Sequence, residues 1–144
     1  VYLFSLGLYA FVNERYLAAL VALMVFVPLI VFFFFNKIPA KLLPGDSLTY
    51  FLGGTLATIA ILGDIEKAAV IASIPFFVEF ILKLRSKLRA HSYGYLVDGK
   101  IKTDYKKIYS LTHLFTRTGK YTEKQIVFYL ILVEVFFSAL IWVV

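Results

Sequence analysis

The stretch YLAALVALMVFVPLIVFFFF, residues 16–35, decides the fold class, because it contains twenty residues without a charged side chain. An α-helix rises about 1.5 Å per residue, so a stretch of this length crosses a hydrocarbon core of about 30 Å. The rest of the 144-residue chain is similar in character: 61% of it is hydrophobic, 18% aromatic and only 17% charged. Soluble domains are about 45–50% apolar. The composition therefore excludes a water-soluble globular domain and predicts a membrane protein.

Four further apolar segments flank this span. They are residues 1–12, which are too few to cross a bilayer, and residues 48–62, 68–84 and 125–144. We predict an all-α polytopic membrane protein with four transmembrane helices plus a partial N-terminal one. A polar turn at residues 63–67 joins two spans, with Asp64 as the N-cap of the second. Within the spans, Pro75 predicts a kink, and the pair Gly53-Gly54 predicts close approach by another helix.

The basic residues predict how the chain is oriented in the membrane. Because each span reverses sides, residues 36–47 and 83–124 share one face, and residues 13–15 and 63–67 share the other. Of the 15 Lys and Arg residues, thirteen lie on the first face and two on the second. Basic loops stay in the cytoplasm, so the first face is predicted to be cytoplasmic, in a plasma membrane or an endoplasmic reticulum membrane. The membrane topology thus accounts for the excess of Lys and Arg over Asp and Glu. We therefore expect no nucleic-acid partner.

The loop at residues 85–124 is predicted to be structured. Residues 93–103 alternate around Asp98-Gly99, a pair that favours the positive φ angles of a type I′ turn, so we expect a small hairpin. Apolar and aromatic residues between 105 and 117 recur at helical spacing. This spacing predicts a second element, an interfacial helix on the membrane surface.

Asp46 is the most suggestive single residue, because it places a carboxylate behind a Pro-Gly turn at the cytoplasmic start of a span. It could simply cap the helix. It could also be a Mg²⁺ ligand, since Mg²⁺ usually binds one or two carboxylates together with substrate phosphates. The absence of cysteine excludes disulfides and thiolate metal sites. The local sequence leaves both interpretations of Asp46 open.

The remaining polar candidates also have two interpretations each. His91 and His113 lie in the basic loop, where a histidine is either solvated or close to an anionic ligand. Glu79 and Glu134 lie within apolar spans, where an ionisable group is costly. Such a glutamate is either hydrogen-bonded in the bundle interior or functional.

Three stretches resemble one enzyme family, in the family's order. They are LPGDSLTYFLGGTLATIAILG at residues 43–63, FFVEFILKLRSK at residues 76–87 and THLFTRTGKYTEKQ at residues 112–125. The first looks like the Gly-Asp helix of the polyprenyl-phosphate N-acetylhexosamine-1-phosphate transferases. The other two resemble the helix that enters the family's last cytoplasmic loop and its histidine loop. The form of the first stretch is nearest the archaeal and eukaryotic branch, which acts on UDP-GlcNAc and dolichyl phosphate.

The chain departs from the family pattern in two places. The histidine cluster of the bacterial members is reduced here to His113. The upstream aspartates of the family have no match in residues 1–35, and family members have more spans. Residues 1–144 thus resemble the C-terminal membrane half of a larger transferase, and we expect this part to be inactive without the N-terminal half.

The resemblance implies transfer of GlcNAc-1-phosphate, or a related hexosamine-1-phosphate, from a UDP-sugar to a polyprenyl or dolichyl phosphate, with release of UMP. This is a step toward the lipid-linked oligosaccharide of N-glycosylation. Asp46 would be catalytic as a ligand of Mg²⁺, or alternatively Mn²⁺. His113 and Arg117 would contact nucleotide phosphates, and Arg89 and His91 would recognise the sugar.

Two questions stay open at this point. A homodimer is compatible with the sequence. A non-catalytic membrane module, such as a transporter half, a scaffold or an anionic-lipid-binding subunit, would also explain four spans and a basic loop.

Overall fold

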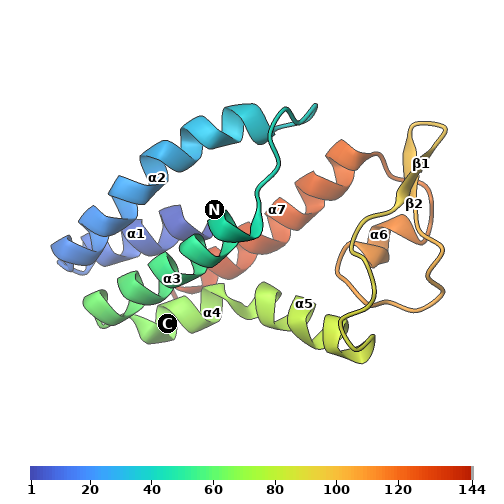
Figure 1. Cartoon of the computed structure of the whole chain (residues 1–144). Helices are drawn as coiled ribbons and strands as arrows, with labels where there is room; N and C mark the ends of the chain where they lie inside the picture. Colours follow the sequence, from blue (N-terminus) through green and yellow to red (C-terminus); the bar gives the residue numbers. More distant parts are fainter. Residues whose placement is uncertain (144) are drawn as a thin grey trace. The chain divides into compact units, whose positions relative to one another are not determined.

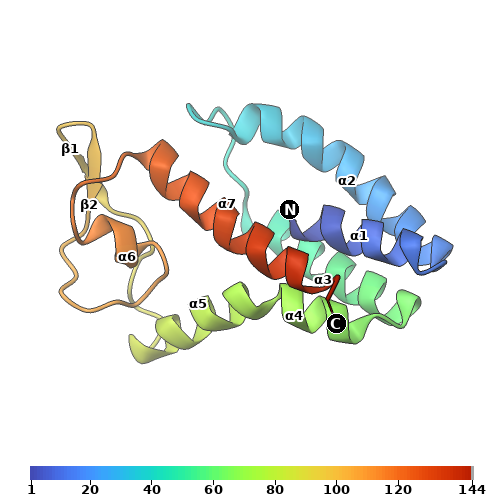
Figure 2. The same cartoon turned by 180° about the vertical axis from the view of Figure 1, so that it is seen from behind.

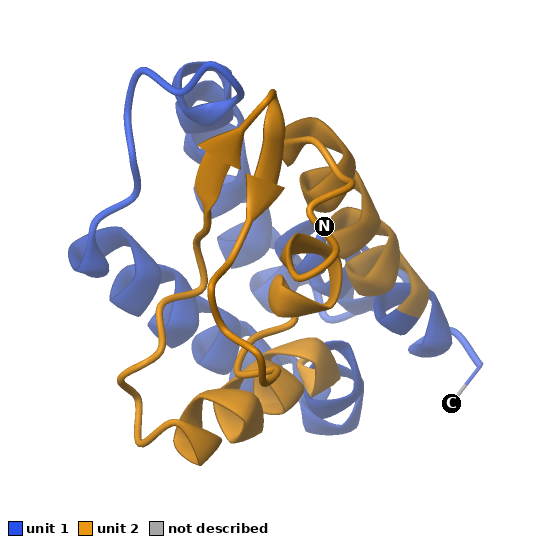
Figure 3. Cartoon of the chain, turned by 90° about the vertical axis from the view of Figure 1, so that its right-hand side faces the viewer, with its two compact units in different colours: residues 1–72, 137–144 blue, residues 73–136 orange. Residues whose placement is uncertain are grey.

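The computed structural model describes residues 1–143, and most of them are helical (Figure 1). The chain forms two compact units (Figure 3). The first contains residues 1–72 and 137–144, and the second contains residues 73–136.

Two long apolar helices dominate the first unit. Among the described residues, α2 (Tyr16–Asn36) and α3 (Asp46–Gly63) are the two helices long and apolar enough to cross a membrane. The shorter α1 (Tyr2–Val12) packs against α2, and α2 packs against α3. A seven-residue helix, α4 (Glu66–Ala72), follows α3. The prediction of a mostly helical chain is therefore confirmed, and two of the four expected spans are candidate membrane-spanning helices by length and composition.

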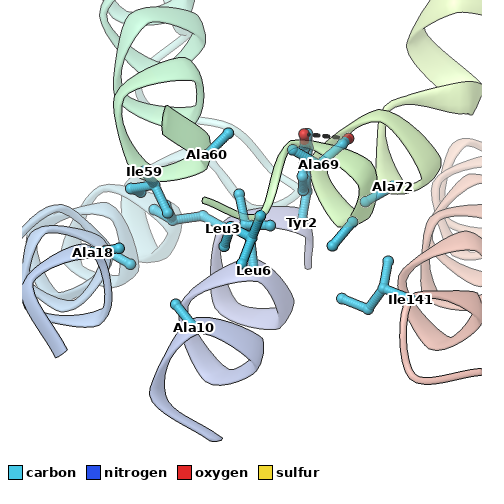
Figure 4. Close-up of a cluster of buried hydrophobic side chains, with 13 residues drawn as sticks. Tyr2, Leu3, Leu6, Ala10, Ala18, Ile59, Ala60, Ala69, Ala72 and Ile141 are labelled. Atoms are coloured by element: carbon cyan, nitrogen blue, oxygen red, sulfur yellow. Dashed lines mark hydrogen bonds between the residues drawn. The ribbon is translucent and has the colours of Figure 1, made fainter. Parts of the chain in front are cut away.

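Small and branched apolar side chains fill the core of the first unit (Figure 4). Leu6 and Ile59 are fully buried, and the Tyr2 hydroxyl donates a hydrogen bond of 2.7 Å to the Ala69 carbonyl oxygen. The remaining core residues are Leu3, Ala10, Ala18, Ala22, Ala60, Ile65, Ala68, Ala72 and Ile141. Small residues let helix backbones approach closely, which is how helices pack inside lipid.

The close helix approach occurs at a different glycine from the pair that the sequence suggested. A Cβ on Gly7 would lie 2.7 Å from the Cβ of Ala22, so this glycine allows α1 to meet α2. A Cβ on Gly53 or Gly54 would meet no described atom within 4 Å. The predicted approach at Gly53-Gly54 is therefore wrong for the described residues.

Asp64 ends a helix instead of starting one. It is the C-cap of α3 in the left-handed conformation, with φ 50° and ψ 43°, and its N–H bonds the carbonyl groups of Ala60 and Ile61. The predicted N-cap role is wrong, because aspartate also tolerates the left-handed geometry with which helices commonly end.

The predicted span at residues 68–84 is broken at Ser73. There α4 ends at Ala72, and α5 (Ile74–Arg85) begins two residues later. Pro75 lies in the first turn of α5 and has no N–H to donate to the preceding turn. The expected kink is thus a full interruption of the helix.

The second unit contains α5, a hairpin, the short helix α6 (His113–Thr116) and most of α7 (Glu123–Leu140). Both views place the hairpin and α6 at the N-terminal end of α7 (Figure 1, Figure 2). The last span, predicted at 125–144, ends as a helix at Leu140, and residue 144 lies outside the described residues.

The predicted hairpin is confirmed. Strands β1 (Tyr95–Val97) and β2 (Lys100–Lys102) pair antiparallel. Asp98 and Gly99 between them have φ angles of 49° and 77°. Positive φ at both central residues is the requirement of the type I′ turn.

The predicted interfacial helix at residues 105–117 is wrong, since only α6 is helical there. Backbone donors that would build such a helix bond side chains instead. The Tyr109 N–H donates to His113 Nδ1, and the Leu111 N–H donates to Glu79. Side chains that capture backbone groups in this way compete with helix formation.

Candidate active site

Asp46 is the first residue of α3, directly after an extended Gly45 that serves as N-cap without a side chain. The alternative role of Asp46 as the N-cap is therefore wrong. Its carbonyl oxygen accepts a hydrogen bond of 2.9 Å from the Thr49 hydroxyl, while its carboxylate is exposed and has no hydrogen-bond partner among residues 1–143. The N-terminal end of a helix dipole is positive, so a negatively charged side chain is favourable at this place.

The chain before Asp46 is folded back onto the end of α2. The N–H groups of Lys41 and Leu42 donate to the Phe35 carbonyl oxygen at 2.8 and 3.1 Å, and the Asn36 side chain donates to the Leu42 carbonyl oxygen at 2.9 Å. These bonds fix the approach of the loop to α3. The loop is therefore held to the end of α2 as far as Leu42, four residues before Asp46.

The donor set available to a divalent cation is small. Within residues 1–143, no group of three or more His, Asp or Glu side chains could hold a metal ion. Asp46 offers one carboxylate, which fits a Mg²⁺ ion whose other ligands are substrate phosphates, water or groups outside this chain. It does not fit a cation held by this chain alone.

The loop after α5 is held by side chains that bond three consecutive carbonyl groups. Lys83 Nζ donates to the Ala90 carbonyl oxygen at 3.0 Å. His113 Nε2 bonds the His91 carbonyl oxygen at 2.9 Å, and the Thr112 hydroxyl donates to the carbonyl oxygen of Ser92. Residues 90–92 thus have a defined path although they form no helix or strand.

His113 is fully buried, and both of its ring nitrogens are occupied. Because Nδ1 accepts the Tyr109 N–H at 3.2 Å, Nε2 must carry the proton that it donates to His91. The ring of Tyr105 stacks on the His113 ring at 5.1 Å between centroids. Direct contact of His113 with a nucleotide phosphate would require one of these bonds to break.

The other three predicted loop residues are exposed. The His91 side chain stacks on Tyr93 with 4.9 Å between ring centroids. Arg89 lies just before the held segment, and the Arg117 N–H donates to the His113 carbonyl oxygen at 3.2 Å. The second unit therefore brings His91, His113 and Arg117 into one loop assembly, whereas Asp46 belongs to the first unit.

Sequence reasoning missed the organising role of Glu79. Its carboxylate accepts hydrogen bonds from Ser92 Oγ at 3.3 Å, Ser110 Oγ at 2.8 Å and the Leu111 N–H at 2.7 Å. Of the two interpretations of Glu79, the structure shows the hydrogen-bonded one, but its partners lie in the loop and not in the bundle interior. The only signal in the sequence was the presence of a carboxylate within an apolar stretch.

A shallow cavity of about 410 Å³ lies in the first unit, at the end of α3 opposite Asp46. It is lined by the turns around Asn13 and Asp64, including the Arg15–Asp64 ion pair at 3.4 Å. Exposed pairs of this kind contribute little to stability. None of the predicted site residues lines this cavity.

Two curated archaeal proteins are similar to the chain over most of its length. One, from Saccharolobus solfataricus, is 40% identical over 129 residues, which make up 89% of this chain and 40% of that protein. The other, from Sulfolobus acidocaldarius, is 34% identical over 129 residues, which make up 89% of this chain and 39% of that protein. Both carry the provisional name UDP-N-acetylglucosamine–dolichyl-phosphate N-acetylglucosaminephosphotransferase. The chain thus spans about two fifths of the length of the curated relatives it matches.

The family model described as glycosyl transferase family 4 matches residues 1–64, a range that includes Asp46. No solved structure matches the chain. The resemblance suggested by the three sequence stretches is confirmed by this match and by the two relatives: residues 1–64 of the chain match glycosyl transferase family 4.

Proposed function

We propose that the full-length protein containing these residues transfers GlcNAc-1-phosphate from UDP-GlcNAc to a polyprenyl phosphate of the dolichyl type and releases UMP. The observation that carries this proposal is the exposed carboxylate of Asp46, which lies at the first residue of an apolar, membrane-length helix and has no hydrogen-bond partner among residues 1–143. The proposed reaction brings two anionic phosphates together at a membrane surface. A carboxylate that is not bonded to other side chains can hold the divalent cation that these phosphates need. The names of the two relatives supply the substrate class.

Asp46 would serve as one ligand of Mg²⁺, or alternatively Mn²⁺. When bound, the cation would neutralise phosphate charge and align the attacking and leaving oxygens. This chain contributes one carboxylate, and its placement at a helix start keeps that carboxylate at the membrane surface. The remaining ligands would come from the substrates, water and the part of the enzyme outside this chain.

The loop of the second unit would receive the nucleotide sugar. Arg89, His91 and Arg117 are exposed and can offer donors to phosphate or sugar oxygens. His113 stays in the proposed site, where it would contribute by holding the backbone of His91. The exposed side chains would thus contact the nucleotide sugar, and the buried His113 would fix the position of one of them, His91.

In this proposal the chain crosses the membrane four times, through α2, α3, the interrupted pair α4 and α5, and α7. The loop before α3 and the loop between α5 and α7 then share the cytoplasmic face. The bilayer would supply the lipid acceptor at that face.

The direct test is release of UMP from UDP-GlcNAc by the full-length protein in detergent. We expect release to depend on the polyprenyl phosphate acceptor and on Mg²⁺, and we expect residues 1–144 alone to be inactive. A transporter half or scaffold subunit would release no UMP. An anionic-lipid-binding subunit would bind acidic vesicles through its basic loop without regard to the nucleotide. The absence of UMP release by the full-length protein would contradict the transferase assignment in both cases.

A further inference from the structure

Glu79 occupies an unusual place for a carboxylate. It lies in the middle of α5, half-buried, among phenylalanine and branched side chains that are largely exposed on the same helix. Each of the neighbours Phe77 and Phe80 exposes more than half of its side-chain surface. Placing a carboxylate in such an apolar helix costs free energy unless the carboxylate is hydrogen-bonded. The hydrogen-bond partners of Glu79 therefore indicate its role.

All three partners of Glu79 lie in the loop and are distant in sequence. Oε1 accepts bonds from the hydroxyl groups of Ser92 and Ser110, and Oε2 accepts the N–H of Leu111. These partners are 13, 31 and 32 residues away along the chain. One side chain therefore ties both arms of the loop, the arm before the hairpin and the arm after it, to α5.

The bonds continue from Glu79 to the exposed candidate His91. Ser110 contacts the Thr112 hydroxyl at 2.9 Å, and Thr112 donates to the Ser92 carbonyl oxygen. The next residue along, His113, bonds the His91 carbonyl oxygen at 2.9 Å. The backbone that carries the exposed His91 ring is thus held by a network that ends on the Glu79 carboxylate.

We infer that Glu79 is the positioning residue of the nucleotide-sugar loop: its three hydrogen bonds hold residues 110–113 against residues 91–92, so that His91 faces the substrate in one fixed arrangement. This inference rests on the proposed function for the identity of the substrate. The hydrogen bonds carry it, and glutamine can satisfy the same partners. Its amide oxygen can accept the Leu111 N–H, while its amide group can donate to a serine hydroxyl.

Two substitutions of similar size separate hydrogen bonding from simple bulk. Glu79→Gln keeps an acceptor for the Leu111 N–H, whereas Glu79→Leu removes every partner. In the full-length protein we expect Glu79→Leu to raise the KM for UDP-GlcNAc by about tenfold or more while kcat stays within about threefold. Glu79→Gln should restore the KM to within about threefold of the wild-type value. Glu123→Leu replaces an exposed glutamate at the start of α7 and is the matched control, with no expected change in KM.

A second measurement does not depend on catalysis. Hydrogen exchange at the Leu111 amide in detergent should be slow in the wild type and in Glu79→Gln, and about tenfold faster or more in Glu79→Leu. Equal exchange in all three proteins would overturn the anchoring role. Equal KM values, a fall in kcat alone, or a Glu79→Gln variant as impaired as Glu79→Leu would overturn the positioning role.

The two measurements also separate this inference from the proposed function. If the wild-type protein released no UMP, the transferase assignment would fail, and with it the effect of Glu79 on UDP-GlcNAc. The exchange experiment would still decide whether Glu79 anchors the loop.

Discussion

Asp46 and Glu79 are both carboxylates on apolar helices, and their surroundings are opposite. Asp46 stands at the first residue of α3, exposed and without a partner among the described residues. Glu79 stands in the middle of α5 and accepts three hydrogen bonds from the loop. A carboxylate without hydrogen-bond partners at a helix start is available to a ligand, whereas a carboxylate that accepts three hydrogen bonds fixes the backbone around it.

The largest expected effect follows from replacing the free carboxylate. We expect Asp46→Asn to lower the turnover of the full-length protein by about 100-fold or more, because the amide keeps the shape but loses the charge that a divalent cation needs. Thermal stability in detergent should change little, since the carboxylate has no hydrogen-bond partner in the described part of the chain and only its favourable interaction with the helix dipole is removed. Near-normal turnover in Asp46→Asn would remove this residue from the proposed site.

A smaller effect, of a different kind, is expected at His113. His113→Ala would leave the Tyr109 N–H and the His91 carbonyl oxygen without their partner in a partly buried place. We expect this change to destabilise the loop by about 1–3 kcal/mol. Protease sensitivity of the loop should rise, and turnover should fall less than in Asp46→Asn. An unchanged loop would show that these buried bonds do not hold it.

His91→Ala should show the reverse pattern to His113→Ala. The His91 side chain is exposed, so its loss should leave the loop stable. The KM for UDP-GlcNAc should rise by about threefold to tenfold because a direct contact is lost. If His91→Ala destabilised the loop as much as His113→Ala, the division between exposed contact residues and buried holding residues would be wrong.

The smallest effect is expected at the hairpin. The Tyr95 hydroxyl donates a 2.6 Å hydrogen bond to Asp104, which raises the pKa of Tyr95 above its ordinary value. Any stabilisation from this bond is present at neutral pH and is lost only as the pH rises through that raised pKa. Because the pair is exposed, Tyr95→Phe should not measurably change UMP release or thermal stability at neutral pH. A marked loss of either would give the hairpin a role that the loop network does not predict.

Local features of this fold could be predicted from the sequence. The pair Asp98-Gly99 is sufficient to predict the turn between β1 and β2, because the φ angles of these two residues decide the type of the turn. The helix α2 can also be predicted locally, because the length and composition of its apolar stretch are sufficient. Asp46 was also recognisable, since its position after Pro44 and Gly45 carries both the helix start and the family resemblance.

Features that depend on distant residues could not be predicted. Tyr105, Tyr109 and His113 recur every four residues, which favours a helix in the sequence alone. In the fold the two tyrosine rings instead pack around the buried His113 ring in an irregular loop. Glu79 captures a backbone donor 32 residues away, and no local pattern reveals that contact.

In the proposed topology the Asp46 carboxylate and the anchored loop face the same compartment, and sided cysteine labelling tests this prediction. The chain contains no cysteine, so single cysteines introduced as Ser47→Cys, Lys107→Cys and Asp64→Cys each report one position within it. In sealed vesicles we predict that a membrane-impermeant reagent labels Ser47→Cys and Lys107→Cys from the cytoplasmic side and Asp64→Cys from the opposite side. Labelling of Ser47→Cys and Lys107→Cys from opposite sides would contradict this topology, because both loops are predicted to lie on the cytoplasmic face.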